Sequence, residues 1–154
     1  MSTDYKKIIA TNRKASFNYH IEETIEVGII LTGPEVKSLR LKSANIADTH
    51  ADFMKGEIYV FNMYISEYEK ANGFSQQQPR RPRKLLIHKR QSRKLLGKIK
   101  QKGYTLVATS LYFNNKNIAK LELALAKGKK LHDKREDIKQ KDWNREQSRT
   151  LREK

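Results

Sequence analysis

The first third of the chain alternates hydrophobic and polar residues with a period of two. Apolar side chains take every second position over residues 17–21 and again over 25–31, with Glu22 and Glu23 between the two runs. This period is typical of half-buried strands, so it predicts two strands joined by a short acidic turn. The pattern stops at Gly33 and Pro34, where proline suits the first turn of a short helix reaching residue 40.

Two hairpins follow from the same alternation. Residues 50–54 and 57–65 flank a Lys-Gly dipeptide that fits a tight turn. Residues 104–113 and 118–126 are rich in β-forming residues and flank an Asn-rich turn. Together with the first two strands, these runs predict about six strands.

The segment between the hairpins changes in character. Residues 72–82 are polar, with Gly, Ser, Gln and Pro, and predict an exposed loop. Ser92, Leu95, Leu96 and Ile99 then fall at helical spacing, which predicts one buried stripe on a helix that Gly103 would end.

Many short strands with only two helices predict a mainly β fold with flanking helices. We expect an OB-like antiparallel β-barrel of about six strands, because closure removes unpaired strand edges; a compact α+β sandwich is the alternative. The barrel would take up residues 1–126. Residues 127–154 form a basic tail in which 17 of 28 residues are charged, so the tail builds no core of its own. Its acid-before-base pairs at helical spacing predict a helix that is disordered when free and forms on binding.

Charge is the most informative feature after periodicity. The chain has a net charge of +16, and residues 79–103 contain eleven Lys or Arg without a single Asp or Glu. A solvated face normally mixes signs, so an acid-free block indicates a polyanion-binding surface. Nucleic acid is favoured over a membrane surface, because the block lacks the aromatic residues of a membrane-lying helix.

Composition argues against several other classes. The absence of Cys removes disulfides and thiolate metal sites, and the four His residues lack metal-binding spacing, so we expect no metal or other cofactor. The first residues carry no apolar segment like a signal peptide, and every apolar run is far too short to span a membrane, so the expected location is the cytoplasm. The chain is not expected to be an enzyme. A ribonuclease is the enzymatic alternative, with His88 and His20 as acid–base candidates.

Aromatic residues divide into two groups. Tyr104, Tyr112 and Phe113 could stack on bases, but in strands such side chains more often belong to the core. Trp143 lies in a tail without a core, which favours docking on a partner.

Four motifs give the chain a family resemblance. They are NRKASFNYHIEETIEVGIILTGPEVKSLR from Asn12, NIAD from Asn45, RPRKLLIHKR from Arg81 and ELALAKGKKLHDKR from Glu122. In this order and spacing they resemble the small protein B family, the tmRNA-binding proteins of bacteria. The resemblance covers almost the whole chain.

The resemblance implies an OB-like barrel that binds the tRNA-like domain of tmRNA and accompanies it, with elongation factor Tu, to stalled ribosomes. It implies a non-enzymatic rescue factor in trans-translation, expected to be a monomer; a general RNA-binding translation factor without tmRNA specificity is the alternative. On matching positions, the implied tmRNA-binding residues are Asn12, Glu26, Leu86, Lys37, Arg40, Arg83, Lys84 and His88.

The same resemblance implies that the tail enters the vacant decoding site and the mRNA channel, against small-subunit rRNA. His132 would stack on an rRNA base there. The implied decoding-site residues are Gly128, Lys129, Lys130, His132, Asp133, Lys134, Arg135 and Trp143. Four positions depart from the usual family pattern, namely Gln77, Gln91, Ser92 and Ala108, and they bear on local stability more than on identity.

Overall fold

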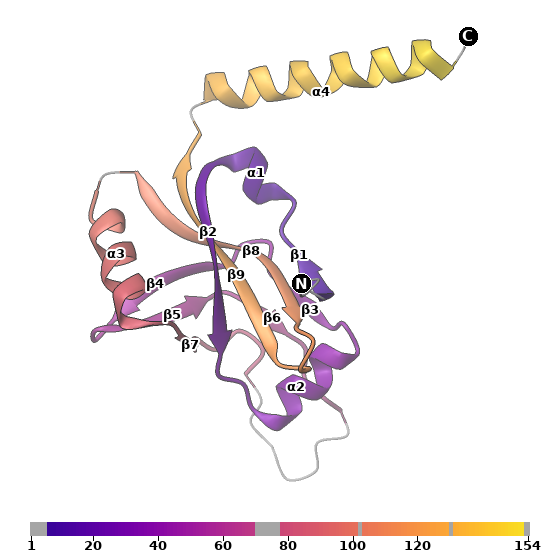
Figure 1. The fold of residues 1–154 in the computed structure, drawn as a ribbon. Coiled ribbons are helices and arrows are strands. Elements are labelled where there is room, and N and C mark those ends of the chain that lie inside the picture. Colours follow the sequence, from indigo (N-terminus) through magenta and orange to yellow (C-terminus); the bar gives the residue numbers. More distant parts are fainter. Residues whose placement is uncertain (1–5, 70–77, 102, 130, 153–154) are drawn as a thin grey trace.

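The computed structural model describes residues 6–69, 78–101, 103–129 and 131–152, which form strands, short helices and one long terminal helix (Figure 1). The strands are β1 (Lys7–Thr11), β2 (Tyr19–Ile29), β3 (Ala44–Asn45), β4 (His50–Met54), β5 (Glu57–Phe61), β6 (Tyr64–Ile65), β7 (Arg83–Leu86), β8 (Tyr104–Phe113) and β9 (Ala119–Gly128). The helices are α1 (Lys14–Asn18), α2 (Gly33–Arg40), α3 (Lys89–Ile99) and α4 (Leu131–Arg152).

Six antiparallel strands close into a barrel. Each strand pairs with the next in the order β8, β4, β5, β7, β2 and β9, and the β8–β9 pairing closes the ring. β1 adds to the edge of β8 beyond β4, while β3 and β6 pair separately. The predicted OB-like barrel with flanking helices is therefore confirmed, and the sandwich alternative is wrong.

The strands of the barrel differ from the prediction in three places. The run expected as one strand over residues 57–65 is divided into β5 and β6, and β6 pairs with β3 outside the barrel. The two strands expected around Glu22 and Glu23 are one eleven-residue strand, β2, whose register against β9 shifts between Ile21 and Glu23. The acidic pair therefore marks a β-bulge, which kinks a strand without ending it. Arg83 and Lys84 of the acid-free block lie in a strand that the sequence pattern did not predict, β7, which pairs with both β5 and β2. This short strand joins β5 to β2 in the ring. Its inward residues, Arg83 and Leu85, and its outward residues, Lys84 and Leu86, each include one basic and one apolar side chain, so hydrophobicity does not alternate along it.

The local signals for turns and helix starts are confirmed. Lys55 and Gly56 have φ values of 53° and 79°, as a tight β-hairpin requires. Thr32 and Glu35 form a capping box at the start of α2, with Pro34 in the first turn. Helix α3 ends at Ile99, earlier than expected from Gly103, whose φ of 90° instead turns the chain into β8.

The core fills the barrel interior with aliphatic side chains from the predicted strands. Leu106, Leu111, Leu121 and Leu123 are fully buried. Leu95 of α3 is 2% exposed and joins the same cluster, so α3 covers the barrel with its predicted apolar stripe. The remaining faces of α3 are left to carry its basic residues.

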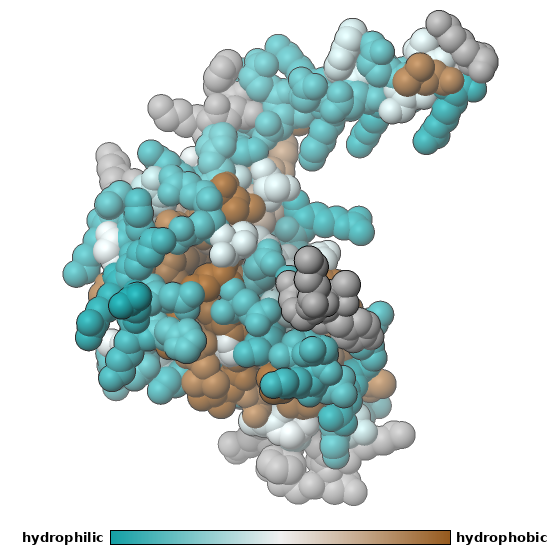
Figure 2. All heavy atoms as spheres, viewed as in Figure 1, coloured by the Kyte–Doolittle hydropathy of each residue, from teal (hydrophilic) through white to brown (hydrophobic). Residues whose placement is uncertain are grey.

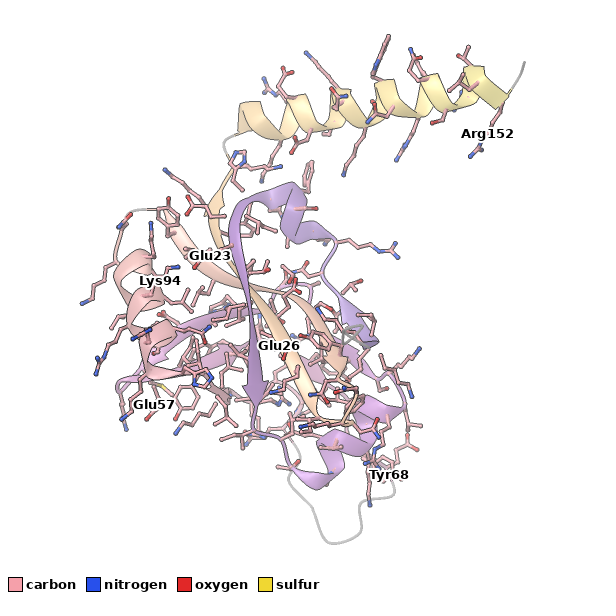
Figure 3. All side chains as sticks on the ribbon, viewed as in Figure 1. Glu23, Glu26, Glu57, Tyr68, Lys94 and Arg152 are labelled. Carbon is pink, nitrogen blue, oxygen red and sulfur yellow. The ribbon has the colours of Figure 1, made fainter. Side chains whose placement is uncertain are left out.

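Helix α4 extends away from the barrel, and its far end bears Arg152 (Figures 1 and 3). Residues 141–150 are all exposed, and Figure 2 shows hydrophilic side chains along most of the helix. The tail is thus helical, as its charge spacing predicts, while its disorder in the free protein stays a prediction. Among the described residues, no helix is both long enough and apolar enough to span a membrane.

Candidate nucleic-acid interface

The outer face of β2 and β7 brings together two of the predicted RNA-binding residues. Gly28 of β2 lies opposite Leu86 of β7. Paired residues project to the same face, and Glu26 shares that face because it is two positions from Gly28. Leu86 is 55% exposed, so this leucine of a barrel strand presents its side chain to solvent. The register therefore places an exposed carboxylate and an exposed apolar side chain on one surface.

Gly28 has a packing reason at this place. A Cβ on Gly28 would lie 3.1 Å from the Cβ of Leu86, closer than ordinary van der Waals contact. The missing side chain lets Leu86 lie flat across β2.

Glu26 is oriented by an aromatic residue that the sequence did not single out for this role. Its Oε2 accepts a short hydrogen bond from the hydroxyl of Tyr112, whose ring lies 4.7 Å from the ammonium of Lys6. Tyr112 and Phe113 are 1% and 4% exposed, so they are not platforms for base stacking. Tyr112 instead fixes the direction of the carboxylate while its second oxygen remains available to accept another donor.

Hydrogen bonds and strand pairing connect Asn12 to Glu26. Its backbone N–H donates to the carbonyl of Thr109 at 2.9 Å, and the hydroxyl of Thr109 donates to Oε1 of Glu122 at 2.9 Å. Glu122 pairs directly across to Glu26. Asn12, Glu26 and Leu86 therefore follow one outer surface across β1, β8, β9, β2 and β7, which we call the Glu26 face.

Cations flank the Glu26 face on the side of α3. Lys84 shares the outer face of β7 with Leu86, and its Nζ lies 3.5 Å from Oε2 of Glu57. His88 is the N-cap residue of α3 and is exposed, with no side-chain capping bond. Lys94 of α3 reaches Glu23 of β2 at 3.3 Å, and both residues are labelled in Figure 3. The other basic residues exposed on α3 are Lys89, Arg90 and Arg93.

Lys37 and Arg40 are exposed on α2, at one end of the barrel. The ammonium of Lys37 lies 5.6 Å from the centre of the Tyr68 ring, a cation–π contact. These two residues are available to a large ligand, although they lie on a different element from the Glu26 face.

Arg83 requires a correction. Its side chain is 0% exposed, and Nε and Nη2 contact Oε2 of Glu35 at 2.6 Å and 2.5 Å. Nη1 donates to the carbonyl of Met63 at 2.8 Å, and Nη2 donates to that of Pro79 at 3.0 Å. A guanidinium enclosed in this way cannot meet a phosphate at the surface. Alternation along β7 gives the reason, because Arg83 and Leu85 point inward where Lys84 and Leu86 point outward.

Glu35 also binds Arg81, which completes a buried cluster between α2 and the segment leading into β7. Arg81 Nη2 lies 2.5 Å from Oε1, and the N–H of Thr32 donates to the same oxygen at 2.9 Å. Burial raises the pKa of Glu35, but the hydrogen bonds from Arg81, Thr32 and Arg83 outweigh it and hold the pKa below its ordinary value. Burial also disfavours the charged form of Arg83 and so lowers its pKa, and the interaction with Glu35 partly offsets this effect. The cluster ties the loop before β7 to α2.

The start of the tail is held against α1. Lys129 donates from its backbone N–H to the carbonyl of Asn18 at 2.9 Å, and from Nζ to the carbonyl of Ser16 at 2.8 Å. Its Nζ also pairs closely with Asp137 of α4. The ammonium groups of Lys134 and Lys141 lie 5.9 Å and 5.8 Å from the Phe17 ring. Hence Lys129 and Lys134, predicted to meet the ribosome, bind the body of the protein in this structure.

The remaining predicted tail residues are distributed along one projecting element. Gly128 ends β9, Arg135 is exposed, and Trp143 is 57% exposed with no burial against the barrel. Lys130 and the side chains of His132 and Asp133 lie outside the described residues, as does Gln77. Ser92 of α3 is half-buried, and Ala108 is fully buried in β8.

The structure does not bring the two histidines of the ribonuclease alternative together. His20 lies on β2 opposite Lys127, whereas His88 follows β7, whose Leu86 lies opposite Gly28. β7 runs antiparallel to β2, so His88, two residues after Leu86, is about six residues of strand from His20, or about 20 Å at ~3.3 Å per residue. They cannot act on one phosphate. Within the described ranges, no cluster of three or more His, Asp or Glu could hold a metal ion.

Comparisons with known proteins identify the family. The model of the SmpB protein family matches residues 9–153. The SsrA-binding protein of Rickettsia conorii is 58% identical over 152 residues, covering 99% of each chain. That of Rickettsia bellii strain OSU 85-389 is 59% identical over 151 residues, covering 98% of this chain and 99% of its own.

A solved structure agrees with these sequence relatives. It is described as "tmRNA-SmpB: a journey to the center of the bacterial ribosome" and is 46% identical, with a TM-score of 0.64, covering 84% of this chain and 87% of its own. The match of residues 9–153 to one family model, together with relatives above half identity over almost the whole chain, means that this chain belongs to the SmpB protein family.

Proposed function

We propose that this protein binds tmRNA and acts in trans-translation on the ribosome. The observation that carries the proposal is the Glu26 face, where Asn12, Glu26 and Leu86 share one outer surface beside the cations of α3. The SmpB family and the tmRNA-SmpB neighbour support the same function. A basic surface alone would bind any RNA, so the non-basic residues carry the specificity.

Each group on the face has chemistry suited to folded RNA. The carboxylate of Glu26, held by Tyr112, accepts hydrogen bonds from a base edge or a ribose hydroxyl. Leu86 offers an apolar contact for an unstacked base or a sugar. Lys84, His88 and the exposed cations of α3 neutralise phosphates, with Lys37 and Arg40 serving the more distant backbone. Arg83 contributes through the fold of β7.

The tail has a separate partner in this proposal. Residues 128–154 enter the vacant decoding site and the mRNA channel of a stalled ribosome, where Trp143 docks and His132 stacks on an rRNA base. An exposed tryptophan on a helix without a core supports docking on a partner. The contacts of Lys129 and Lys134 with α1 would then be exchanged for contacts with rRNA.

The proposal includes the setting of this reaction. The protein is a non-enzymatic, monomeric factor of the cytoplasm that reaches the ribosome with the tRNA-like domain of tmRNA and elongation factor Tu. Family membership supports this setting, since trans-translation needs tmRNA on a ribosome.

The test is competition binding. A tRNA-like tmRNA fragment is titrated against an excess of bulk tRNA at moderate and high salt. Phosphate contacts weaken with a log–log slope of roughly −0.7 to −0.9 per neutralised phosphate, whereas base and ribose contacts do not release counterions. A preference for the fragment that persists at high salt supports the proposal. Equal binding that salt abolishes would reduce the protein to a general RNA binder.

The division of labour is tested with tail variants. We expect removal of residues 128–154 to preserve binding of the fragment and to abolish ribosome rescue in a reconstituted translation assay. His132→Ala should impair rescue more than binding. Loss of fragment binding on truncation, or equal losses in both assays for His132→Ala, would contradict a separate role for the tail.

A further inference from the structure

Ile30 lies on the Glu26 face, directly after the end of β2. Its backbone N–H donates to the carbonyl of Lys84 at 3.0 Å, so it extends the pairing of β2 with β7 by one residue. Alternation along the strand places its side chain on the same outer side as Glu26 and Gly28. Ile30 is 45% exposed. An isoleucine therefore occupies an outward position at which antiparallel sheets normally carry a polar residue.

Ile30 and Leu86 form one apolar surface beside Gly28. Gly28 is buried although it lies on the outer face, because Leu86 covers it: a Cβ on Gly28 would lie 3.5 Å from Cδ1 and 3.7 Å from Cγ of Leu86. Ile30 follows two positions later, about 6.6 Å along the strand at ~3.3 Å per residue. Figure 2 shows hydrophobic side chains at the surface around the end of β2, in the view of Figure 1. A single exposed aliphatic residue is ordinary, but two neighbours on one face form a patch.

The neighbouring lysine leaves this patch uncovered. Lysine stems often lie along apolar side chains next to them and hide them from solvent. Lys84 is the residue of β7 next to Ile30 in the register, but its Nζ lies 3.5 Å from Oε2 of Glu57. Glu57 belongs to β5, on the side of β7 that is remote from β2. The ammonium group therefore borders the patch without crossing Ile30.

The patch and its surroundings suit an unpaired nucleotide. Paired bases are stacked inside a helix, so the faces of a nucleobase are free only where the RNA is unpaired. Such a face is apolar and can pack on two aliphatic side chains. The cations around the patch, Lys84 and the exposed lysine and arginine residues of α3, favour a polyanion over an apolar protein segment.

We infer that Ile30 contacts RNA together with Leu86, and that the two side chains pack against one unpaired nucleobase. The base belongs to the RNA that the Glu26 face binds, so the inference rests on the proposed function. It makes Ile30 a specificity residue, because packing on a base releases no counterions and its contribution persists at high salt.

The first measurement uses Ile30→Thr, which keeps the β-branched shape that strands favour and replaces the ethyl group with a hydroxyl. Binding of the tRNA-like tmRNA fragment at high salt should weaken roughly fourfold, the effect of about one buried methylene group. The urea unfolding midpoint should stay close to that of the unaltered protein, since the side chain is exposed. Unchanged binding by Ile30→Thr would overturn the inference.

Ile21→Thr is the matched control. Ile21 is also on β2 and is 39% exposed, but it lies beyond the β-bulge, about 30 Å from Ile30 at ~3.3 Å per residue. The control should change affinity by less than about twofold. Equal losses in the two variants would mean that the effect is not particular to the position of Ile30, and would overturn the inference.

A double variant tests whether Ile30 and Leu86 share one base. The loss in Ile30→Thr with Leu86→Ala should be smaller than the product of the two single losses, because removing either side chain already weakens the contact of the other with the same base. A loss equal to the product would mean that the two residues contact separate parts of the RNA, and would refute the shared surface.

The RNA side of the contact is tested with single abasic sites at the unpaired positions of the fragment. At one position, the unaltered protein should bind the abasic fragment more weakly, and Ile30→Thr should cause no further loss there. A loss from Ile30→Thr that persists at every abasic position would mean that Ile30 contacts no base. Failure of the unaltered protein to prefer the fragment over bulk tRNA would instead refute the proposed function.

Discussion

Replacing Glu35 with Gln tests the buried cluster that holds β7. The substitution preserves the shape of the side chain and removes its charge. The guanidinium of Arg83, which is fully buried, would lose its carboxylate, and Arg81 would lose its partner at 2.5 Å. The positive charge would then remain inside the protein without compensation.

The expected loss is large for a single substitution. Removing one partner of a buried ion pair costs roughly 3–5 kcal/mol. Because Gln retains one oxygen that can still accept from an arginine, we expect the low end, about 3 kcal/mol. At roughly 2–4 °C per kcal/mol for a chain of this size, the melting temperature falls by about 6–12 °C.

Glu57→Gln provides the matched control. Glu57 also pairs with a cation of β7, but at 3.5 Å and with 55% of its side chain exposed. Such surface pairs contribute roughly 0–1 kcal/mol. Urea unfolding followed by circular dichroism at pH 7 should separate the two variants clearly. A loss for Glu35→Gln that is as small as the loss for Glu57→Gln would refute the argument for a buried, unpaired charge.

The stability difference between the unaltered protein and Glu35→Gln should also depend on pH. The pKa of Glu35 is lowered from the ordinary value of 4.5, so its ionised form stabilises the fold above that pH. The contribution is lost as the pH falls through the lowered pKa of the folded state. The stability difference between the unaltered protein and Glu35→Gln should therefore be constant at neutral pH and shrink below about pH 4.5. A difference that grows on acidification would contradict this sign.

Three further predictions concern the Glu26 face and the tail. Leu86→Ala should weaken binding of the tRNA-like fragment about fivefold in a gel-shift assay, with an unfolding free energy within about 0.5 kcal/mol of the unaltered protein, because Leu86 is exposed; a purely structural role would reverse these two effects. Gly28→Ala should cost about 1 kcal/mol and lower RNA affinity, since its Cβ would lie 3.1 Å from that of Leu86 and displace it; unchanged affinity would show that the position of Leu86 is unimportant. Phe17→Ala should raise amide exchange in the first turns of α4 without changing fragment binding, because two lysine contacts with the ring are lost; equal protection would mean that the Lys129 contacts alone hold the helix.

Local signals in the sequence determined much of the barrel. The Lys55–Gly56 turn, the Pro34 helix and the hairpin of residues 104–126 depend on backbone preferences and on periodicity, which act between neighbours in the chain. The acid-free block likewise indicated a nucleic-acid surface from composition alone. The family motifs named Asn12, Glu26 and Leu86 as RNA-binding residues without showing that they share a face.

The tertiary structure decided the features that depend on pairing between distant segments. The continuity of β2 through Glu22 and Glu23 could be established only from its register against β9. Two adjacent acidic residues predict a turn when the partner strand is unknown. The burial of Arg83 required the alternation of β7 and the carboxylate of Glu35, 48 residues away.

The sequence by itself determined most of the strands, the hairpin turns and the basic block, because these depend on neighbouring residues, whereas β7 and the continuity of β2 depend on pairing between distant segments. Only the tertiary structure decided which side chains are buried together and which of them pair, because burial and hydrogen-bond satisfaction arise from residues that are distant in the chain.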